Sequence, residues 1–392
     1  MKLNMKTHQA RPNAKPHQHG FSLVELMIGL TLGLFVIGGV IAIFSATQQA
    51  NRATEGLSRS QETSRLGFEL MARSLREAGG TLCSTRIPVL NALAPAGAKP
   101  AALWWLDPSV AIRGFDNGTA LPATPNGPPA SGAGSRIAGT DAVHITTASL
   151  QRGYNITAHS PAIALPPLPA NTYQLNTATP NLQGGDLVMA CDFRQGALFQ
   201  ARTVAPVGTH SNVVYDTAAG LSPGNASVQF GFPAGTGYNF MRPPLLMPAI
   251  LAPFTAELWY IGQSVTNTGP ARRSLYRMGL TNTAGTTVTL QREEILEGVT
   301  DMQITYLMNS PVGGATAAGL VNLTGVTDYV PADATWTNTR WEDALAVRIT
   351  LTVEVPTGSS TRADVPATAD IQENLTTQRI LTQTITLRDR LQ

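Results

Sequence analysis

One long apolar run lies near the start of the chain. It extends from Phe21 to Ala46, and its single charged residue is Glu25. The 21 residues from Leu26 to Ala46 carry no charge, and as a helix that rises about 1.5 Å per residue they span about 30 Å, the thickness of a bilayer core. The run is too long for the apolar core of a cleaved secretory signal, so the pattern predicts a membrane-spanning helix.

The helical pattern continues beyond the membrane segment, over residues 47–78. This stretch contains no proline, and Gly79 and Gly80 follow it, as glycine commonly follows the last turn of a helix. Apolar and small residues recur at spacings of three, four and seven, which predicts that they share one face. These residues are Leu57, Ser64, Phe68, Met71, Leu75 and Ala78. A helix with such a stripe must pack it against a folded head.

After residue 80 the pattern changes from helical to alternating. Residues 345–355 alternate between apolar side chains and polar or small ones, the pattern of a half-buried antiparallel strand. Residues 185–192 and 197–204 flank a short turn and predict a hairpin. Further strands are expected at 142–147, 256–262, 274–280, 286–292, 301–307 and 378–388. Because strands and helices do not alternate, the predicted class is α+β, with one long N-terminal helix packed on a mostly antiparallel β-sheet head.

These patterns divide the chain into consecutive parts. They are a basic leader (1–20), the transmembrane half of the helix (21–46), its amphipathic half (47–78) and a β-rich head (79–392). Some stretches of the head are rich in Gly, Pro, Ala or Thr and are predicted to be loops, namely 95–136, 205–250 and 310–340. Long loops in a compact domain are commonly functional or disordered. Either one of them contacts a partner, or they are variable surface.

The charge distribution orients the predicted membrane helix. The net charge of +2 is distributed unevenly along the chain. The leader holds four basic residues and no acidic one, whereas the remainder holds 23 basic and 25 acidic residues. The four are Lys2, Lys6, Arg11 and Lys15. A basic segment before a membrane helix is expected to stay in the cytoplasm, which places the head in the periplasm. The weakly acidic remainder gives no electrostatic footprint for nucleic acid.

Two cysteines, Cys83 and Cys191, lie in the predicted head. They share no C-x-x-C motif and have no histidine at ligand spacing, so we expect no zinc site. An exported head enters an oxidising compartment, which favours a disulfide between them. The bond would close a loop of 108 residues (191 − 83), which stabilises by on the order of 4 kcal/mol in the chain-entropy model. The alternative is two buried free thiols.

The sequence offers one match to a catalytic motif. Residues 220–224 fit G-x-S-x-G, but Ser222 is followed by Pro223, which has no N–H to donate in an oxyanion hole. The histidines beyond the leader are scattered without metal-ligand spacing, at His144, His159 and His210. We therefore expect no catalytic residue, no metal and no cofactor, and hence no enzyme.

The junction between the leader and the apolar run resembles that of type IV prepilins. It reads HGFSLVELMI over residues 19–28, with a glycine, a phenylalanine that opens the apolar run, and a glutamate at the fifth position after the glycine. The resemblance implies that a prepilin peptidase cuts between Gly20 and Phe21 and that Phe21 becomes N-methylated. It also implies that Glu25 supports filament assembly. A carboxylate at membrane depth needs a counter-charge, and the new amine of Phe21 on an adjacent subunit would supply one.

The head resembles the PilW family of minor pilins in its size and in several segments. These are 79–83, 185–192, 274–277, 296–299 with 302–306, and 341–349. The resemblance implies a structural and assembly subunit of a type IV pilus that promotes pilus initiation or forms part of a tip complex. The expected partners are the prepilin peptidase, other minor pilins, the major pilin, a pilus tip adhesin and the lipid of the inner membrane.

The same resemblance implies a location. The subunit would be held in the bacterial inner membrane before assembly and displayed on the cell surface, in the pilus, afterwards. Twitching motility, cell adhesion and DNA uptake all remain open as the biological role.

Two other functions fit the same N-terminal pattern. A pseudopilin of a type II secretion system shares the leader and the helix, and a calcium site in the head would favour it. An enzyme or receptor tethered by an uncleaved signal anchor would retain residues 1–20 in the mature protein. The mature N-terminus therefore separates the signal-anchored protein from both kinds of pilin.

Overall fold

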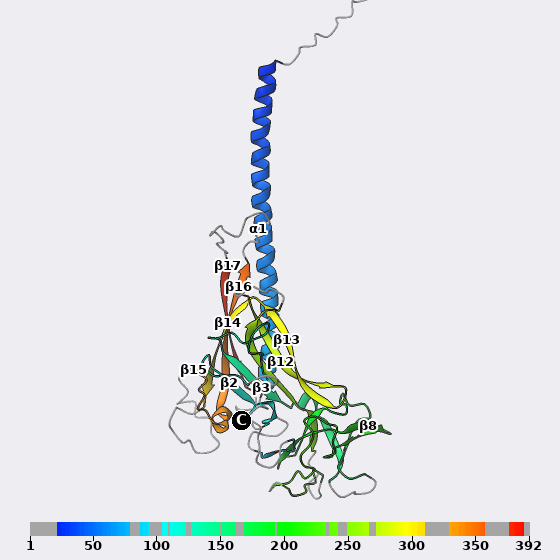
Figure 1. Ribbon diagram of the computed structural model, residues 1–392. Coiled ribbons are helices and arrows are strands. Elements are labelled where there is room, and N and C mark those ends of the chain that lie inside the picture. The colour runs from blue at the N-terminus through cyan, green and yellow to red at the C-terminus, as the bar shows by residue number, and fades with distance from the viewer. Residues whose placement is uncertain are drawn as a thin grey trace, which may run out of the picture.

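A long helix projects from a β-rich head in the computed structural model of the protein (Figure 1). The structure describes residues 22–78, 87–93, 104–108, 110–122, 127–148, 150–161, 168–192, 194–232, 235–241, 249–265, 272–309, 329–356 and 376–387. The class is α+β, as the sequence predicts, and almost all described strand pairs are antiparallel.

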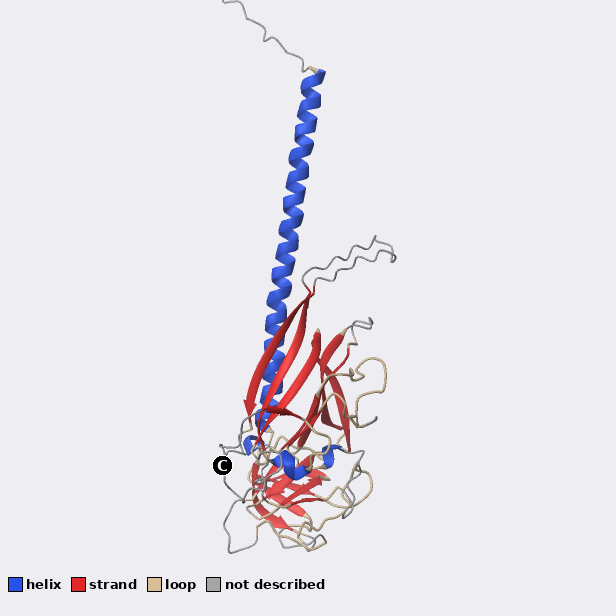
Figure 2. Cartoon of the chain, turned by 90° about the vertical axis from the view of Figure 1, so that its left-hand side faces the viewer, coloured by secondary structure: helices blue, strands red, loops and turns tan. Residues whose placement is uncertain are grey.

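The helix α1 runs from Leu23 to Glu77. Its first half, Leu23–Gln48, is long and apolar enough to cross a membrane, and it stands clear of the head (Figure 2). Its second half lies along the head and contacts β16, β17 and β13, whose bounds are given below. The predicted stripe is buried there, at Ser64, Phe68, Met71, Leu75 and Ala78. The side chain of Leu57 lies outside the described residues.

Two sheets flank the second half of α1. The central sheet has the strand order β13-β12-β11-β3-β2, and the lateral sheet has the order β15-β14-β16-β17. The central strands are β2 (Ile112–Phe115), β3 (Ala142–Thr147), β11 (Thr255–Gln263), β12 (Arg273–Thr283) and β13 (Thr287–Glu297). The lateral strands are β14 (Val299–Met308), β15 (Tyr329–Pro331), β16 (Ala344–Pro356) and β17 (Thr376–Thr386).

Gly298 alone connects the two sheets between β13 and β14. Its φ of +85° lies in the left-handed region, which glycine adopts without a steric penalty. The chain turns there from the edge of the central sheet into the middle of the lateral sheet. The helix and both sheets therefore enclose one core, in which Phe68 of α1 and Trp259 of β11 lie in the same cluster as Val347 of β16.

A third, distal sheet has eight strands in the order β1-β7-β6-β10-β4-β5-β9-β8. Its strands are β1 (Val89–Asn91), β4 (Tyr154–Ser160), β5 (Thr172–Leu175), β6 (Leu187–Cys191), β7 (Gly196–Gln200), β8 (Thr203–Val207), β9 (His210–Val214) and β10 (Ile250–Pro253). The part around β8 lies at the end of the head that faces away from the protruding half of α1 (Figure 1).

The central sheet is covered on both faces because successive residues of a strand point to opposite sides. In β11, Trp259 and Ile261 belong to the core shared with α1. Leu258 and Tyr260 belong instead to a second cluster, shared with β6 and β7 of the distal sheet. The head is thus layered, with the central sheet between α1 and the distal sheet.

The strands expected from alternation are present within a few residues of their predicted bounds. The predicted hairpin is formed by β6 and β7, which pair antiparallel. The sequence did not predict the short strands β1, β2, β4, β5, β10 and β15, or the helical turns η1 (Trp104–Leu106), η2 (Leu150–Arg152) and α2 (Asn338–Glu342). All three stretches predicted to be loops contain strands. The stretch 95–136 contains β2, 205–250 contains β9 and most of β8, and 310–340 contains β15.

Candidate functional site

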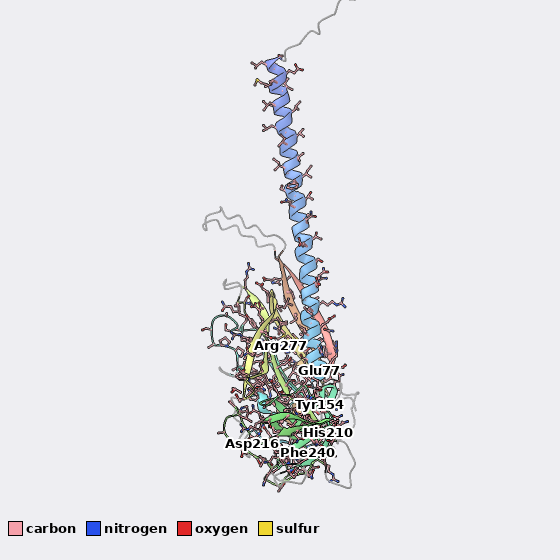
Figure 3. All side chains as sticks on the ribbon, turned by 90° about the vertical axis from the view of Figure 1, so that its right-hand side faces the viewer. Glu77, Tyr154, His210, Asp216, Phe240 and Arg277 are labelled. Atoms are coloured by element: carbon pink, nitrogen blue, oxygen red, sulfur yellow. The ribbon has the colours of Figure 1, made fainter. Side chains whose placement is uncertain are left out.

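The protruding half of α1 exposes its apolar side chains on every side. They radiate from the helix with no other described part of the chain beside them (Figure 3). Phe35 is 82% exposed, and most of the large side chains between Leu23 and Phe44 are more than half exposed. Such a surface is unstable in water, so it must be covered by lipid or by other apolar helices.

Four glycines interrupt this apolar surface, namely Gly29, Gly33, Gly38 and Gly39. A Cβ at any of them would meet nothing within 4 Å, so the fold of this chain does not require glycine there. Small residues on an apolar helix allow the backbone of a neighbouring helix to come close. Gly29 and Gly33 are four residues apart and lie on the same side of α1, where such an approach is possible.

Glu25 lies in the first turn of α1 and is exposed. Ser22 precedes the helix without capping it through its side chain, although its carbonyl accepts from the Leu26 amide at 3.1 Å. A carboxylate in the first turn is stabilised by the unpaired N–H groups of a helix start. No described residue forms an ion pair with Glu25, which leaves the carboxylate open to a group from another molecule.

The predicted processing site, Gly20 and Phe21, lies outside the described residues. The roles of Gly20, Phe21 and Glu25 therefore remain predictions from the N-terminal sequence. The structure adds that the helix begins at Leu23, two residues after Phe21. A new amine at Phe21 would thus lie within about two residues of the exposed helix start.

The second half of α1 fixes the protruding half to the head. Gly67 lies against the central sheet, where an added Cβ would be 3.0 Å from Cδ2 of Leu296. Phe68, Met71 and Leu75 fill the core beside it. This packing joins the apolar rod and the head into one unit.

Cys191 is the buried last residue of β6, and Cys83 lies outside the described residues. Val89 of β1 pairs with Gly196 of β7, which pairs in turn with Cys191. Val89 and Cys191 are therefore two strand spacings apart, about 10 Å. Five residues lie between Cys83 and Val89, and the six Cα–Cα steps can extend about 20 Å, so the fold allows the cysteines to meet. The disulfide remains a prediction.

The three histidines of the head lie apart from one another, in β3, β4 and β9. His144 and His159 are buried, and burial lowers the pKa of each to about 3, so both are neutral. His159 stacks on Tyr173 with ring centroids 4.0 Å apart, and its Nε2 lies 2.9 Å from the Tyr215 hydroxyl. Within the described residues, no three His, Cys, Asp or Glu side chains come together as metal ligands.

Ser222, the central residue of the rejected catalytic motif, bonds through its backbone to the start of β13. Its N–H donates to the Thr286 carbonyl at 3.0 Å, and its carbonyl accepts from Val288 at 2.8 Å. The next helix or strand after it in the described part of the chain is the strand β10. This geometry differs from a strand-to-helix nucleophile elbow.

One buried polar group, Gln200 at the end of β7, was not predicted from the sequence. Its Nε2 donates to the Gly185 carbonyl at 2.8 Å, and its Oε1 accepts from the Gly224 amide at 2.8 Å. Asn225 exchanges hydrogen bonds with the backbone of Gln200. These bonds brace the segment after β9 against the distal sheet, and their partners are too distant in sequence to be foreseen.

Comparisons with known families match two separate parts of the chain. The family model described as Type IV Pilus-assembly protein W matches residues 258–389, and the prokaryotic N-terminal methylation motif matches residues 15–41. No curated protein and no solved structure matches the chain. The first match covers most of β11 and everything from β12 to β17, whereas the distal sheet lies between the two matches.

Proposed function

We propose that this type IV prepilin-like chain, which matches the PilW pilus-assembly proteins in its last third, is a minor pilin that helps to start the filament or forms part of its tip. The two family matches and the protruding apolar helix support a pilus-related, membrane-anchored subunit. Both matched families are pilus components rather than enzymes, so the proposed role is structural.

The exposed half of α1 carries this proposal. Before assembly, Leu23–Gln48 would lie in the inner membrane with the head in the periplasm. During assembly the same surface would exchange lipid for the apolar helices of other pilins. Because both environments cover the same side chains, the exchange involves little net exposure of apolar surface to water.

Glu25 would set the position of the subunit along the filament. Its carboxylate is open among the described residues and lies close to the predicted mature amine at Phe21. Inside an apolar bundle an isolated charge is costly, so pairing with the amine of a neighbouring subunit is favoured strongly over a mismatched position. The partners would be the major pilin and other minor pilins.

The distal sheet supports a place at the end of the filament. It is built from residues 89–253, between the helix and the PilW match, and its β8 side faces away from the protruding helix (Figure 1). Subunits of a helical filament stack head-to-tail through the same pair of surfaces. Extra mass at this end of the head would occupy space that the next subunit needs.

The N-terminus of the mature protein tests the proposal. Mass spectrometry would be applied to the chain from membrane and sheared-surface fractions of piliated cells. We expect a chain that begins with N-methylated Phe21 and is present in the sheared fraction. A Gly20→Val variant should remain uncut and confined to the membrane.

Two outcomes would contradict the proposal. An intact Met1 end in the wild-type protein would indicate a signal-anchored protein. A processed chain that still reaches the sheared fraction when the major pilin is deleted would favour a secretion pseudopilin instead.

A further inference from the structure

Asp141 lies where the central and lateral sheets meet. It immediately precedes β3, and only 3% of its surface is exposed. Its backbone N–H donates to the Met302 carbonyl at 2.9 Å, and its Oδ2 accepts from the Ile304 amide at 2.7 Å. One residue therefore fastens the start of β3 to two positions on β14, although 163 residues separate Asp141 from Ile304 in the sequence.

A second carboxyl group lies beside that of Asp141. Oδ1 is buried and has no hydrogen-bond donor among the described residues. The carboxyl of Asp116, which follows β2 and is half-buried, lies within hydrogen-bond reach of Asp141. Two carboxylates can only accept, so they can bond to each other only when one of them holds a proton.

The charged and titratable groups around the pair do not neutralise it. Arg136 directs its guanidinium to backbone carbonyls, with donor distances of 2.6 Å to Thr119 and 2.6 Å to Thr140, and longer ones to Phe115 and Asp116. Tyr306 of β14 is fully buried, and its hydroxyl has no partner in the described part of the chain. Arg136 acts on Asp141 only through the electrostatic field, as the weakest of the influences on it.

We propose that Asp116 and Asp141 are a proton-sharing carboxyl pair that latches β3 to β14, so that the central and lateral sheets hold together more tightly at acidic than at neutral pH. With one proton, the carboxyls bond to each other while Asp141 keeps its bond to Ile304. Without it, two negative charges face each other at the junction of the sheets that enclose α1.

The electrostatics agree with this geometry. Burial is the largest cause that raises the pKa of Asp141, to about 6, and the neighbouring Asp116 adds to it. The bond from Ile304 opposes the shift but does not cancel it. Because the folded-state pKa is raised above the unfolded value, the folded protein binds more protons between about pH 4 and pH 6. Its stability therefore falls across that window as the pH rises, and remains lower above it.

A divalent cation is the competing occupant of the pair. Calcium takes six to eight oxygen ligands. The nearby carbonyls of Phe115, Asp116, Thr119 and Thr140 already accept from Arg136, so few oxygens remain for a metal. A single proton needs only one oxygen from each carboxyl group, which is why we favour it.

The test is the pH dependence of head unfolding in full-length protein in detergent micelles, for wild type, Asp116→Asn and Asp141→Asn. Either amide can donate to the remaining carboxylate, so each variant keeps the bond without the proton. Between pH 4 and pH 7, the unfolding equilibrium constant of wild type should rise up to about a hundredfold relative to Asp141→Asn. Relative to Asp116→Asn it should rise by a smaller factor, because burial still raises the pKa of Asp141 in that variant. The control Asp301→Asn, on the same strand β14, should follow wild type.

The measured quantity is the ratio of the unfolding equilibrium constants of wild type and variant, followed as a function of pH. Any effect of a substitution that does not depend on pH leaves the change of this ratio with pH unaltered. The buried histidines titrate alike in every protein compared and cancel too. A ratio that stays constant from pH 4 to pH 7 for either variant would overturn the proposal, because the pair needs both carboxyl groups. So would stabilisation of wild type, but not of Asp116→Asn, by 1 mM calcium at about pH 7.5, because the pair would then bind a cation as its physiological occupant.

Discussion

Ser74 of α1 donates a hydrogen bond to Glu257 of β11, with 2.7 Å between Ser74 Oγ and Glu257 Oε2. The same carboxylate oxygen accepts from Nε1 of Trp259 at 3.1 Å, and Oε1 lies 3.5 Å from the guanidinium of Arg277. Arg277 also lies over the ring of Trp259. A single glutamate thus connects the helix, a buried tryptophan of the core and the surface of the central sheet.

Glu257→Ala should destabilise the head by about 2–3 kcal/mol, because it leaves Trp259 Nε1 and the Ser74 hydroxyl without this acceptor. Ser74→Ala should cost only about 1 kcal/mol, since the carboxylate keeps its other partners. Denaturant unfolding of the full-length protein in detergent measures both. The matched control is Glu293→Ala, which removes the other partner of Arg277. Its side chain is 55% exposed, so the loss should stay below about 1 kcal/mol.

Gly114 of β2 lies directly on Tyr306 of β14, and a Cβ added there would overlap the Tyr306 ring and hydroxyl. Gly114→Ala should therefore destabilise the junction of the central and lateral sheets by roughly 1–3 kcal/mol. Gly118→Ala, four residues later, should be near neutral, because nothing lies within 4 Å of the added methyl group. Thermal unfolding measures both variants. If Gly114→Ala is as stable as Gly118→Ala, Tyr306 leaves room for a methyl group at position 114.

His144 should make the head sensitive to acid. Burial and the nearby Arg113 lower its pKa to about 3, whereas the unfolded chain binds a proton near pH 6.5. The unfolded state is thus favoured as the pH falls from about 6.5 towards 3, by up to about 1.4 kcal/mol per pH unit. His144→Phe keeps an aromatic ring beside Trp104 and should remove this part of the acid sensitivity. If the stability of wild type and of His144→Phe changes with pH in the same way, His144 is not a cause of acid sensitivity.

The predicted bond between Cys83 and Cys191 is open to a direct measurement. Alkylation of the non-reduced protein should leave its mass unchanged, and alkylation after reduction should add two groups. Cys191→Ser should cost on the order of 4 kcal/mol, and Cys83→Ser with Cys191→Ser should cost no more than the single variant. Two alkylated cysteines without reductant would mean that both are free thiols.

Glu25→Gln should reduce incorporation into pili without lowering the amount of protein in the membrane. The amide keeps the size of the side chain but cannot pair with an amine as a charge. The measurement is the ratio of the chain in the sheared fraction to that in the membrane. Glu55→Gln, a change at another exposed glutamate on α1, is the control and should leave the ratio unchanged. A normal ratio for Glu25→Gln would exclude the charge pair as an assembly contact.

The elements predicted correctly are those with long, unbroken periodicity. The stripe from Ser64 to Ala78 repeats over several helical turns, and residues 345–355 alternate over a whole strand, so local pattern alone reveals which face is buried. The hairpin of β6 and β7 was predictable from its turn. The sequence does not reveal that both faces of this hairpin are buried, because that depends on the parts of the head that pack on either side of it.

The distal sheet was harder to predict because β5 and β10 have only four residues each. So short a segment cannot show a period, and its partners come from distant parts of the chain. The pair of Asp116 and Asp141 at the junction of the central and lateral sheets was not predicted for the same reason, because the two residues and their partners are distant in sequence. Asp116 reads as part of a turn, and nothing in the sequence near Asp141 indicates that it meets Ile304.

The 13-residue strand β16 has a further consequence for a subunit held by its helix. It lies along α1, and β14 and β17 pair with it on its two sides (Figure 1). A pulling force along α1 therefore acts on these ladders lengthwise. Their hydrogen bonds must break together rather than one after another, so the geometry gives the head mechanical resistance to a force applied along α1.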